Sequence, residues 1–348
     1  MKIHFPDNGE IKVSAPCRID FGGTLDIPLL HYTLQHLKPT TFNIAINMRT
    51  SVTLRPHTTG HIKISSRGFA DADLPADNLP FDHPLGLMFA IVTYFRISGI
   101  NIHIESSSPP RSALGGSSTA AVALIAALAK SLNKTISPAN MAVLAYQIES
   151  NVARVPCGIQ DQLAAAYGGV NAWIFEALSN ANPFRQEPVI PIGQYSELEQ
   201  HILIAYCGEP HESKDINGKW IHQFLHGTTR KSWEKIITLT QRFITAIQQQ
   251  DWPTAISAMN EEVNIRCEMT PDVFDVMGNK LHQAAIENKC AARFTGAGGG
   301  GCIWAIGEKK HIDQLKTVWS KVISDHSDAA LLIPSIADCG VINEGETR

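Results

Sequence analysis

The sequence predicts an α+β fold divided into two domains, and three observations predict it. The chain has 348 residues, which is more than one hydrophobic core comfortably holds. Short β-like runs dominate the first hundred residues, whereas strands and long amphipathic helices share the second half. Residues 179–196 hold three prolines and no periodicity, so we place the boundary between the domains there.

In the first half, short strands come before the helices. Residues 84–98 carry apolar side chains at the three- and four-residue spacing of a helix. Ser137 and Pro138 have the residue types of an N-cap and a first helical turn, so a helix is expected from there to Glu149. A buried helix is also expected after Ser118. The expected strands are 11–13, 42–46, 51–54, 61–64, 100–105 and 170–175, with a short helix over 160–167.

The second half has the pattern of a ferredoxin-like domain, in which two β-α-β units share an antiparallel sheet. Thr270 and Pro271 again have the residue types of a helix start. The expected strands are 201–206, 292–295, 302–306 and 331–333. The expected helices are 233–248, 253–269, one that starts at 270–271, and 309–323.

Charge and composition exclude several classes of partner. The formal net charge of −4, without a long basic run, gives no electrostatic basis for binding nucleic acid or a membrane. The seven scattered cysteines contain no C-x-x-C, which argues against a zinc site and a disulfide framework. The N-terminus lacks the apolar core of a signal peptide, and the apolar run 120–129 is too short to span a bilayer. We expect a cytoplasmic protein, either a monomer or a homodimer.

The segment from Pro109 to Lys130 has the features of a phosphate site made by the backbone. Gly115 and Gly116 let backbone amides approach an anion, and the uncharged run after Ser118 predicts a helix whose positive end points at the same place. The segment is neither a Walker A loop, since no Gly-Lys-Ser/Thr closes it, nor a dinucleotide G-x-G-x-x-G. The alternative is a tight turn that leads into a core helix.

A second unusual segment, residues 15–28, joins a strand edge to two glycines and several charges. It carries Arg18, Asp20 and Asp26 on either side of the glycine pair 22–23. The alternative interpretation is a β-turn with solvated charges.

Two further segments add a carboxylate and a glycine run. Residues 158–162 place Asp161 at the start of a short helix. Residues 296–301 are glycine except for Ala297, and so much glycine forfeits backbone entropy unless a close backbone approach requires it. A flexible hairpin is the alternative for the glycine run alone. Because the chain also contains a second phosphate-type loop, we favour a functional role for the glycine run.

These segments together resemble the motifs of the GHMP kinase family, which includes galactokinase, homoserine kinase, mevalonate kinase and phosphomevalonate kinase. The resembling stretches are APCRIDFGGT (15–24) with Asp26, PRSALGGSSTA (110–120) and FTGAGGGG (294–301). Residues 158–171 look most like the sugar-kinase branch, nearest to D-glycero-D-manno-heptose 7-phosphate kinases and the kinase part of fucokinases. The resemblance covers residues 11 to 306.

The resemblance implies a fold and an activity. The fold would be an N-terminal ribosomal protein S5 domain 2-like α/β domain (1–190) followed by a C-terminal ferredoxin-like domain (191–348). The activity would be ATP- and Mg²⁺-dependent phosphorylation of a hydroxyl on a sugar or sugar phosphate, with the anomeric hydroxyl as first choice. Galactokinase-like transfer, a kinase for an isoprenoid precursor or amino alcohol, and a non-catalytic ATP- and sugar-binding sensor are the alternatives.

The resemblance also implies roles for single residues. Asp161 would be the catalytic base, and Arg18 would keep its carboxylate ionised, unless the two form only a structural ion pair. Ser117 and Glu149 would hold Mg²⁺, with Ser118 or Thr119 as alternatives to Ser117, and a solvated helix end as the alternative role of Glu149. The ATP phosphates would contact Leu114, Gly115, Gly116, Ser117, Ser118 and Thr119. The substrate would contact Asp20, Gly22, Gly23, Asp26, Gly298 and Gly299.

The sequence departs from the family pattern in two places. The central loop of the family usually reads Gly-Leu-Gly-Ser-Ser, whereas this chain has Ala113 for the first glycine and Gly116 for the first serine. The first motif is one residue shorter than the Gly-Gly-Gly-Thr-Asp form of heptose kinases. Separately, His222 and His226 have metal-ligand spacing, but without a third ligand we interpret them as a core or surface pair.

Overall fold

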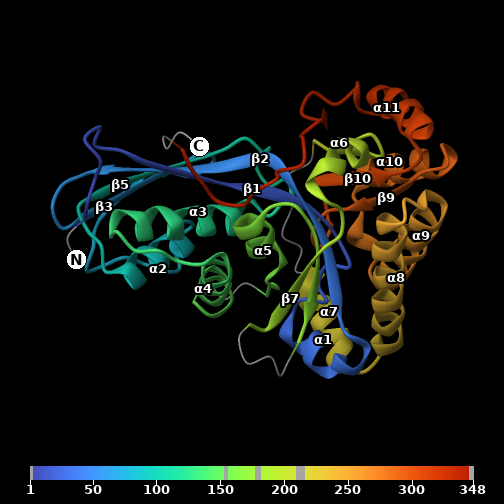
Figure 1. Cartoon of the computed structure of the whole chain (residues 1–348), viewed down its shortest axis with the longest axis horizontal. Coiled ribbons are helices and arrows are strands. Elements are labelled where there is room, and N and C mark those ends of the chain that lie inside the picture. Colours follow the sequence, from blue (N-terminus) through green and yellow to red (C-terminus); the bar gives the residue numbers. More distant parts are fainter. Residues whose placement is uncertain (1–2, 153–155, 177–181, 209–215, 345–348) are drawn as a thin grey trace.

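The computed structural model describes residues 3–152, 156–176, 182–208 and 216–344 and contains two β-sheets (Figure 1). The larger sheet has eight strands in the order β12-β1-β2-β5-β3-β4, with β6 paired to β2 and β7 paired to β6. Its strands are antiparallel except for the parallel pair β3 and β5. The strands are β1 (Ile11–Phe21), β2 (Thr40–Pro56), β3 (His61–Ser66), β4 (Ala72–Pro75), β5 (Ile100–Ser106), β6 (Val170–Phe175), β7 (Phe184–Pro188) and β12 (Ile342–Glu344).

Helices cover one face of this sheet. Figure 1 shows α3 lying along the sheet, with α2, α4 and α5 beside it. Helix α3 carries no charge before Lys130 and is buried along nearly its whole length, so it supplies much of the first hydrophobic core. Ser137 caps α4 by accepting a hydrogen bond from the Asn140 amide, as predicted. The helices of this half are α1 (Pro28–Thr33), α2 (Gly86–Phe95), α3 (Gly116–Ser131), α4 (Pro138–Asn151) and α5 (Gln160–Tyr167).

The smaller sheet has four antiparallel strands in the order β11-β8-β10-β9. The chain runs β8, helices, β9, β10, helix, β11, which is the predicted ferredoxin-like arrangement. The strands are β8 (Ile202–Tyr206), β9 (Ala291–Phe294), β10 (Cys302–Ile306) and β11 (Ala330–Leu332). The helices are α6 (Tyr195–Glu199), α7 (Ile216–Leu225), α8 (Arg230–Gln248), α9 (Trp252–Met269), α10 (Val276–Glu287) and α11 (Lys309–Ile323).

Three details differ from the sequence predictions. Thr270 and Pro271 begin only a 3₁₀ turn over Pro271–Val273, and α10 starts later, where Asp275 accepts a hydrogen bond from the Gly278 amide. The strands expected over 42–46 and 51–54 are one strand, β2, whose pairing with β1 shifts register at Pro16 and Cys17. Elements α1, α6, α7, β4, β7 and β12 were not predicted.

Segments from both halves of the chain meet at β1. Strand β12 pairs with β1 through Lys12 and Glu344, so a segment that follows the smaller sheet completes the edge of the larger one. On its other edge β1 pairs with β2, and its last residues lie in the core shared with α8 and β10. Strand β1 therefore carries its terminal side chains into the region between the two sheets. The domain boundary at residue 190 stays a prediction.

Candidate functional site

A cavity of about 1110 Å³ lies where the loops of both sheets converge. Its walls include the end of β1, the loop after β1, the loop before α3, the N-terminal end of α5 and the start of the glycine run. The four segments singled out in the sequence thus contribute to one cavity. The predicted site residues that line it are Arg18, Asp26, Gly115, Gly116, Ser117, Ser118, Glu149 and Asp161.

Arg18 and Asp161 form a close ion pair in the cavity wall. Nε and Nη2 of Arg18 donate to Oδ1 of Asp161 at 2.8 and 2.7 Å, and Nη1 donates to the Ala113 carbonyl at 2.7 Å. Burial raises the pKa of Asp161 above its usual value, and Arg18 only partly opposes this rise. Arg18 thus favours the ionised carboxylate, as expected of it, while desolvation is the larger effect on the pKa of Asp161. A carboxylate with a raised pKa is a better proton acceptor near neutral pH.

The loop before α3 brings its backbone close to Asp161. Gly115 is the N-cap of α3 with φ +79°, and no side chain caps the helix, so the first amides of α3 have no side-chain acceptor. A Cβ at position 115 would lie 3.1 Å from Oδ2 of Asp161. Ala113, where the family pattern has glycine, still adopts the left-handed conformation with φ +59°. Its carbonyl bond to Arg18 helps hold that conformation.

Glu149 lies buried on α4, beside the start of α3. Its Oε2 accepts hydrogen bonds at 2.7 Å from the Ser118 hydroxyl and from Nε2 of Gln162. Burial raises the pKa of Glu149 to about 7, against the lowering effect of the Ser118 bond. Ser117 also lines the cavity but is exposed. Glu149 is therefore a buried carboxyl group at the cavity wall rather than a solvated helix end.

Asp26 lies under the N-terminal end of α5. Its Oδ2 accepts a hydrogen bond from the Gln160 amide at 2.9 Å, while its buried Oδ1 has no hydrogen-bond partner among the described residues. Burial raises the pKa of Asp26 to about 6. Gly158 makes this position possible, because a Cβ there would overlap the Asp26 carboxylate.

The glycine run packs its backbone against the loop before α3. Gly296 lines the cavity, and its amide donates to Oδ1 of Asp20 at 2.7 Å. A Cβ at Gly301 would lie 2.7 Å from the Ser112 carbonyl. Gly298 and Gly299 do not line the cavity: a Cβ at Gly298 would lie 2.4 Å from the carbonyl oxygen of Val273, and the Gly299 amide donates to that same oxygen. The run therefore serves close backbone packing.

Five other predicted site residues lie behind the cavity wall. Leu114 is in the hydrophobic core, and the Thr119 hydroxyl donates to the Gly115 carbonyl at 2.8 Å. Asp20 is fully buried among arginines. Gly22 packs against Thr240, and a Cβ at Gly23 would lie 2.6 Å from Oδ2 of Asp20. Their predicted contacts with ATP or substrate stay predictions.

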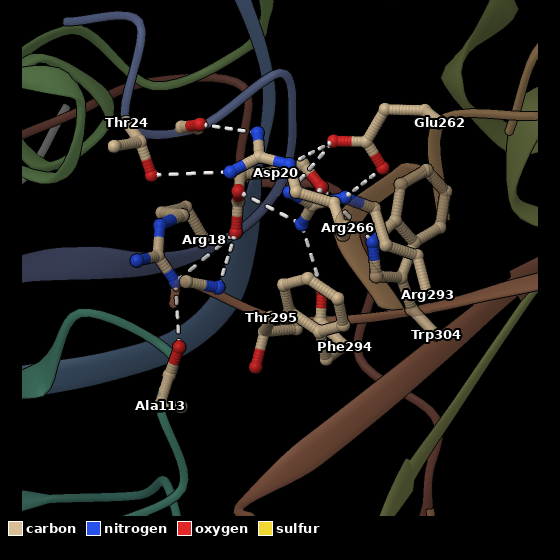
Figure 2. Close-up of polar contacts among 12 residues, drawn as sticks. Arg18, Asp20, Thr24, Ala113, Glu262, Arg266, Arg293, Phe294, Thr295 and Trp304 are labelled. Atoms are coloured by element: carbon tan, nitrogen blue, oxygen red, sulfur yellow. Dashed lines mark hydrogen bonds and ion pairs between the residues drawn. The ribbon is translucent and has the colours of Figure 1, made fainter. Parts of the chain in front are cut away.

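The structure adds residues to which the sequence interpretation gave no individual role. Gly158, Gln160 and Asn217 line the cavity. A buried group of Glu262, Arg266 and Arg293 lies behind it and bonds to Asp20 (Figure 2). Two signals could have revealed this group. Arg266 follows Met259 and Val263 at the helical spacing of a buried face, and Arg293 interrupts an apolar strand.

The described part of the chain offers no comparable metal site or membrane-spanning helix. There, no group of three or more His, Cys, Asp or Glu side chains could hold a metal ion. His222 on α7 and His226 just after its end form an exposed pair with Nε2 atoms 3.1 Å apart. None of the described helices combines the length and the apolar character that a bilayer span requires.

Comparisons with known proteins agree with this architecture. Residues 85–169 match the family described as GHMP kinases N terminal domain. The D-glycero-alpha-D-manno-heptose 7-phosphate kinase of Campylobacter jejuni is 30% identical over 209 residues, which is 58% of this chain and 59% of that relative. A mevalonate kinase of Pyrococcus horikoshii is 25% identical over 297 residues, which is 75% of this chain and 80% of that relative.

Solved structures share the fold over almost the whole chain. The structure of a D-glycero-D-manno-heptose 1-phosphate kinase from Bacteriodes thetaiotaomicron superposes with a TM-score of 0.75 at 19% identity. That alignment covers 97% of this chain and 100% of that structure. GHMP kinases are phosphotransferases, and the relatives named here are kinases. Residues 85–169 therefore form a GHMP kinases N terminal domain, and the two-sheet fold around them is the fold of the solved kinase structure.

Proposed function

We propose that this protein is an ATP- and Mg²⁺-dependent kinase that phosphorylates a hydroxyl group of a sugar or sugar phosphate, with the anomeric hydroxyl as first choice. One observation carries the proposal. The carboxylate of Asp161 lies against Gly115, at the N-terminal end of α3, with Arg18 bonded to it. A proton acceptor and a backbone anion site are therefore adjacent in one cavity, which is the arrangement that phosphoryl transfer needs.

Each part of the cavity would have a distinct task. The uncapped amides at Gly116 and Ser117 would bind phosphate oxygens, and the helix dipole of α3 would favour their negative charge. Asp161 would accept the proton of the acceptor hydroxyl, held in place by Arg18. Apolar side chains that line the cavity, among them Phe69 and Met88, would contact the nucleotide base.

Ser118 and Glu149 fit a hard cation. Both present oxygen atoms at the cavity wall, and Mg²⁺ in kinases usually takes one or two carboxylates together with phosphate oxygens. Burial raises the pKa of Glu149, and a bound cation would oppose that rise. A bound Mg²⁺ would neutralise the charge on the phosphate oxygens. The bond between Ser118 and Glu149 supports Ser118 over Ser117 as the hydroxyl ligand.

The part of the cavity around Asp26, which we call its acceptor end, favours a polyhydroxylated substrate. Oδ1 of Asp26 and Oε1 of Gln160 are buried hydrogen-bond acceptors that lack partners in the described structure. Sugar hydroxyls would donate to them, whereas the carboxylate of mevalonate would be repelled by Asp26. The match to the heptose 7-phosphate kinase points the same way. The mevalonate kinase match covers more of the chain and makes mevalonate the second candidate.

A substrate panel tests the proposal. Purified protein with ATP and Mg²⁺ would be offered heptose 7-phosphate, galactose, other sugars and sugar phosphates, and mevalonate. ADP release identifies the substrate, and ³¹P NMR of the product identifies the phosphorylated hydroxyl. Turnover of mevalonate alone would replace the sugar assignment, and ATP binding without turnover of any acceptor would favour the sensor. The seven cysteines are present as thiols, which fits a reducing compartment, so we propose that the protein acts in the cytoplasm.

A further inference from the structure

A buried chain of alternating charges runs from the cavity into the helices of the smaller sheet (Figure 2). Oδ1 of Asp20 lies 3.7 Å from Nη1 of Arg18, and Oδ2 of Asp20 lies 3.2 Å from Nη1 of Arg293. Arg293 in turn donates to Glu262 at 3.0 Å, and Glu262 accepts from Nε of Arg266 at 2.8 Å. Each buried charge therefore has an opposite neighbour, as burial requires.

Arg266, at the inner end of this chain, also contacts the loop after β1. Its Nη2 donates to the Gly23 carbonyl at 2.6 Å, and its Nη1 donates to Oγ1 of Thr24 at 3.4 Å. The guanidinium lies 4.6 Å from the ring centroids of both Trp220 and Trp233. Arg266 is thus fixed by two rings and by Glu262, and its remaining donors point at the loop.

The contacted loop needs such support. Thr24 has φ +80°, a left-handed conformation that is unfavourable for a β-branched residue. Gly22 is also left-handed, with φ +69°. Two residues after Thr24 comes Asp26, whose unpartnered Oδ1 belongs to the acceptor end of the cavity. Asp26 therefore follows closely after a strained turn that Arg266 contacts from the side away from the cavity.

We propose that Arg266 is a positioning residue for acceptor binding: it holds the segment Gly22–Asp26 in its strained conformation and so keeps Asp26 directed at the acceptor alcohol. This inference rests on the proposed kinase function. Arg266 does not line the cavity, so its effect passes through Gly23 and Thr24. A purely structural role would instead change thermal stability and leave acceptor affinity unchanged, since buried ion pairs can often be replaced by apolar side chains.

Arg266→Lys separates the two roles. Lysine keeps the charge beside Glu262, but one ammonium group cannot serve Glu262, Gly23 and Thr24 together or stack between two rings. We expect KM for the acceptor to rise by about tenfold to a hundredfold, the factor associated with losing a charge-assisted hydrogen bond. KM for ATP should stay within about twofold, because the loop before α3 is not contacted. Arg242→Lys, at an exposed arginine of α8 that pairs with Glu261, is the matched control.

A second variant and a second measurement keep the test decisive. Arg266→Met fills the space between Trp220 and Trp233 and leaves Glu262 paired with Arg293. It can therefore replace the lysine variant in the test if that variant does not fold. Hydrogen exchange of peptides covering residues 20–27 needs no turnover. It should accelerate in both variants, while exchange over 100–130 stays as in the wild type. Acceptor KM within twofold of the wild type, or unchanged exchange over 20–27, would overturn the proposal. If the wild type phosphorylates no acceptor, the exchange result alone decides it.

Discussion

The carboxylate of Asp26 occupies the space that a side chain at Gly158 would need. A Cβ at position 158 would lie 1.8 Å from Oδ2 of Asp26, the atom that accepts the Gln160 amide. Gly158, two residues before α5, therefore limits where the Asp26 carboxylate can lie.

Gly158→Ala should displace Asp26 and weaken acceptor binding. We expect KM for the acceptor to rise by about tenfold or more, the cost of losing one charged hydrogen bond, with KM for ATP unchanged. Steady-state kinetics with each substrate varied in turn would measure this. Gly193→Ala is the control, because a Cβ there meets no atom within 4 Å. Equal kinetics in the two variants would contradict the placement of Asp26.

Asp161→Asn should remove most of the turnover and leave nucleotide binding near normal. An amide oxygen can still accept from Nε and Nη2 of Arg18, so the local geometry is kept while the proton acceptor is lost. A general base typically contributes about 10²–10⁴ in rate. Turnover numbers and calorimetric binding of a non-hydrolysable ATP analogue would be compared with those of Asp313→Asn on the exposed face of α11. Turnover within tenfold of the wild type would exclude Asp161 as the base.

Glu149→Gln should stabilise the metal-free protein at alkaline pH. The folded-state pKa of Glu149 is about 7, above the ordinary value of 4.5, so the folded protein binds this proton more tightly than the unfolded chain. Stability is therefore lost as pH rises from about 4.5 to 7, by roughly 3 kcal/mol at 1.36 kcal/mol per pKa unit. Glutamine does not titrate and can still accept from Ser118 and Gln162.

The thermal midpoints of wild type and Glu149→Gln, without metal or nucleotide, should differ at pH 8 and converge near pH 5. Titration of Asp26 affects both proteins equally and cancels in the difference. Glu234→Gln on the exposed face of α8 is the control and should show no such pH dependence. A difference in midpoint that is the same at both pH values would mean that Glu149 is not buried as an uncompensated carboxyl.

Ser118→Ala and Ser117→Ala should differ in their magnesium requirement. The Ser118 hydroxyl lies 2.7 Å from Oε2 of Glu149, whereas Ser117 is exposed. We expect the Mg²⁺ concentration for half-maximal activity to rise by about tenfold in Ser118→Ala, equivalent to about 1.4 kcal/mol, and to change little in Ser117→Ala. The reverse pattern would assign the metal to Ser117, as the sequence pattern predicted.

Elements with strong local signals were predicted with their ends nearly correct. Residues 160–167 and 309–323 form α5 and α11 with the predicted bounds. Apolar side chains at helical spacing mark α11, and Gly168 ends α5. The start of α10 was missed because Thr270-Pro271 and Asp275 both have the residue types of a helix start. Which of them caps the helix depends on packing around Val273.

The grouping of motifs could be predicted, but the direction of each side chain could not. Asp20 lies in the same strand as Arg18, yet it is neutralised by Arg293 from a strand of the other sheet. That pairing depends on how the two sheets meet, which no local pattern encodes. For the same reason Gly298 and Gly299 were expected at the substrate, although they pack against Val273.

The pairing of β12 with β1 has a consequence for synthesis. The outer edge of β1, the strand that carries Arg18, cannot be covered by its native neighbour until the ribosome has made the entire smaller sheet. During that interval β1 presents unpaired backbone groups, which is a condition that favours association between nascent chains. On overexpression, we therefore expect chains that lack residues 342–344 to be less soluble than the full chain.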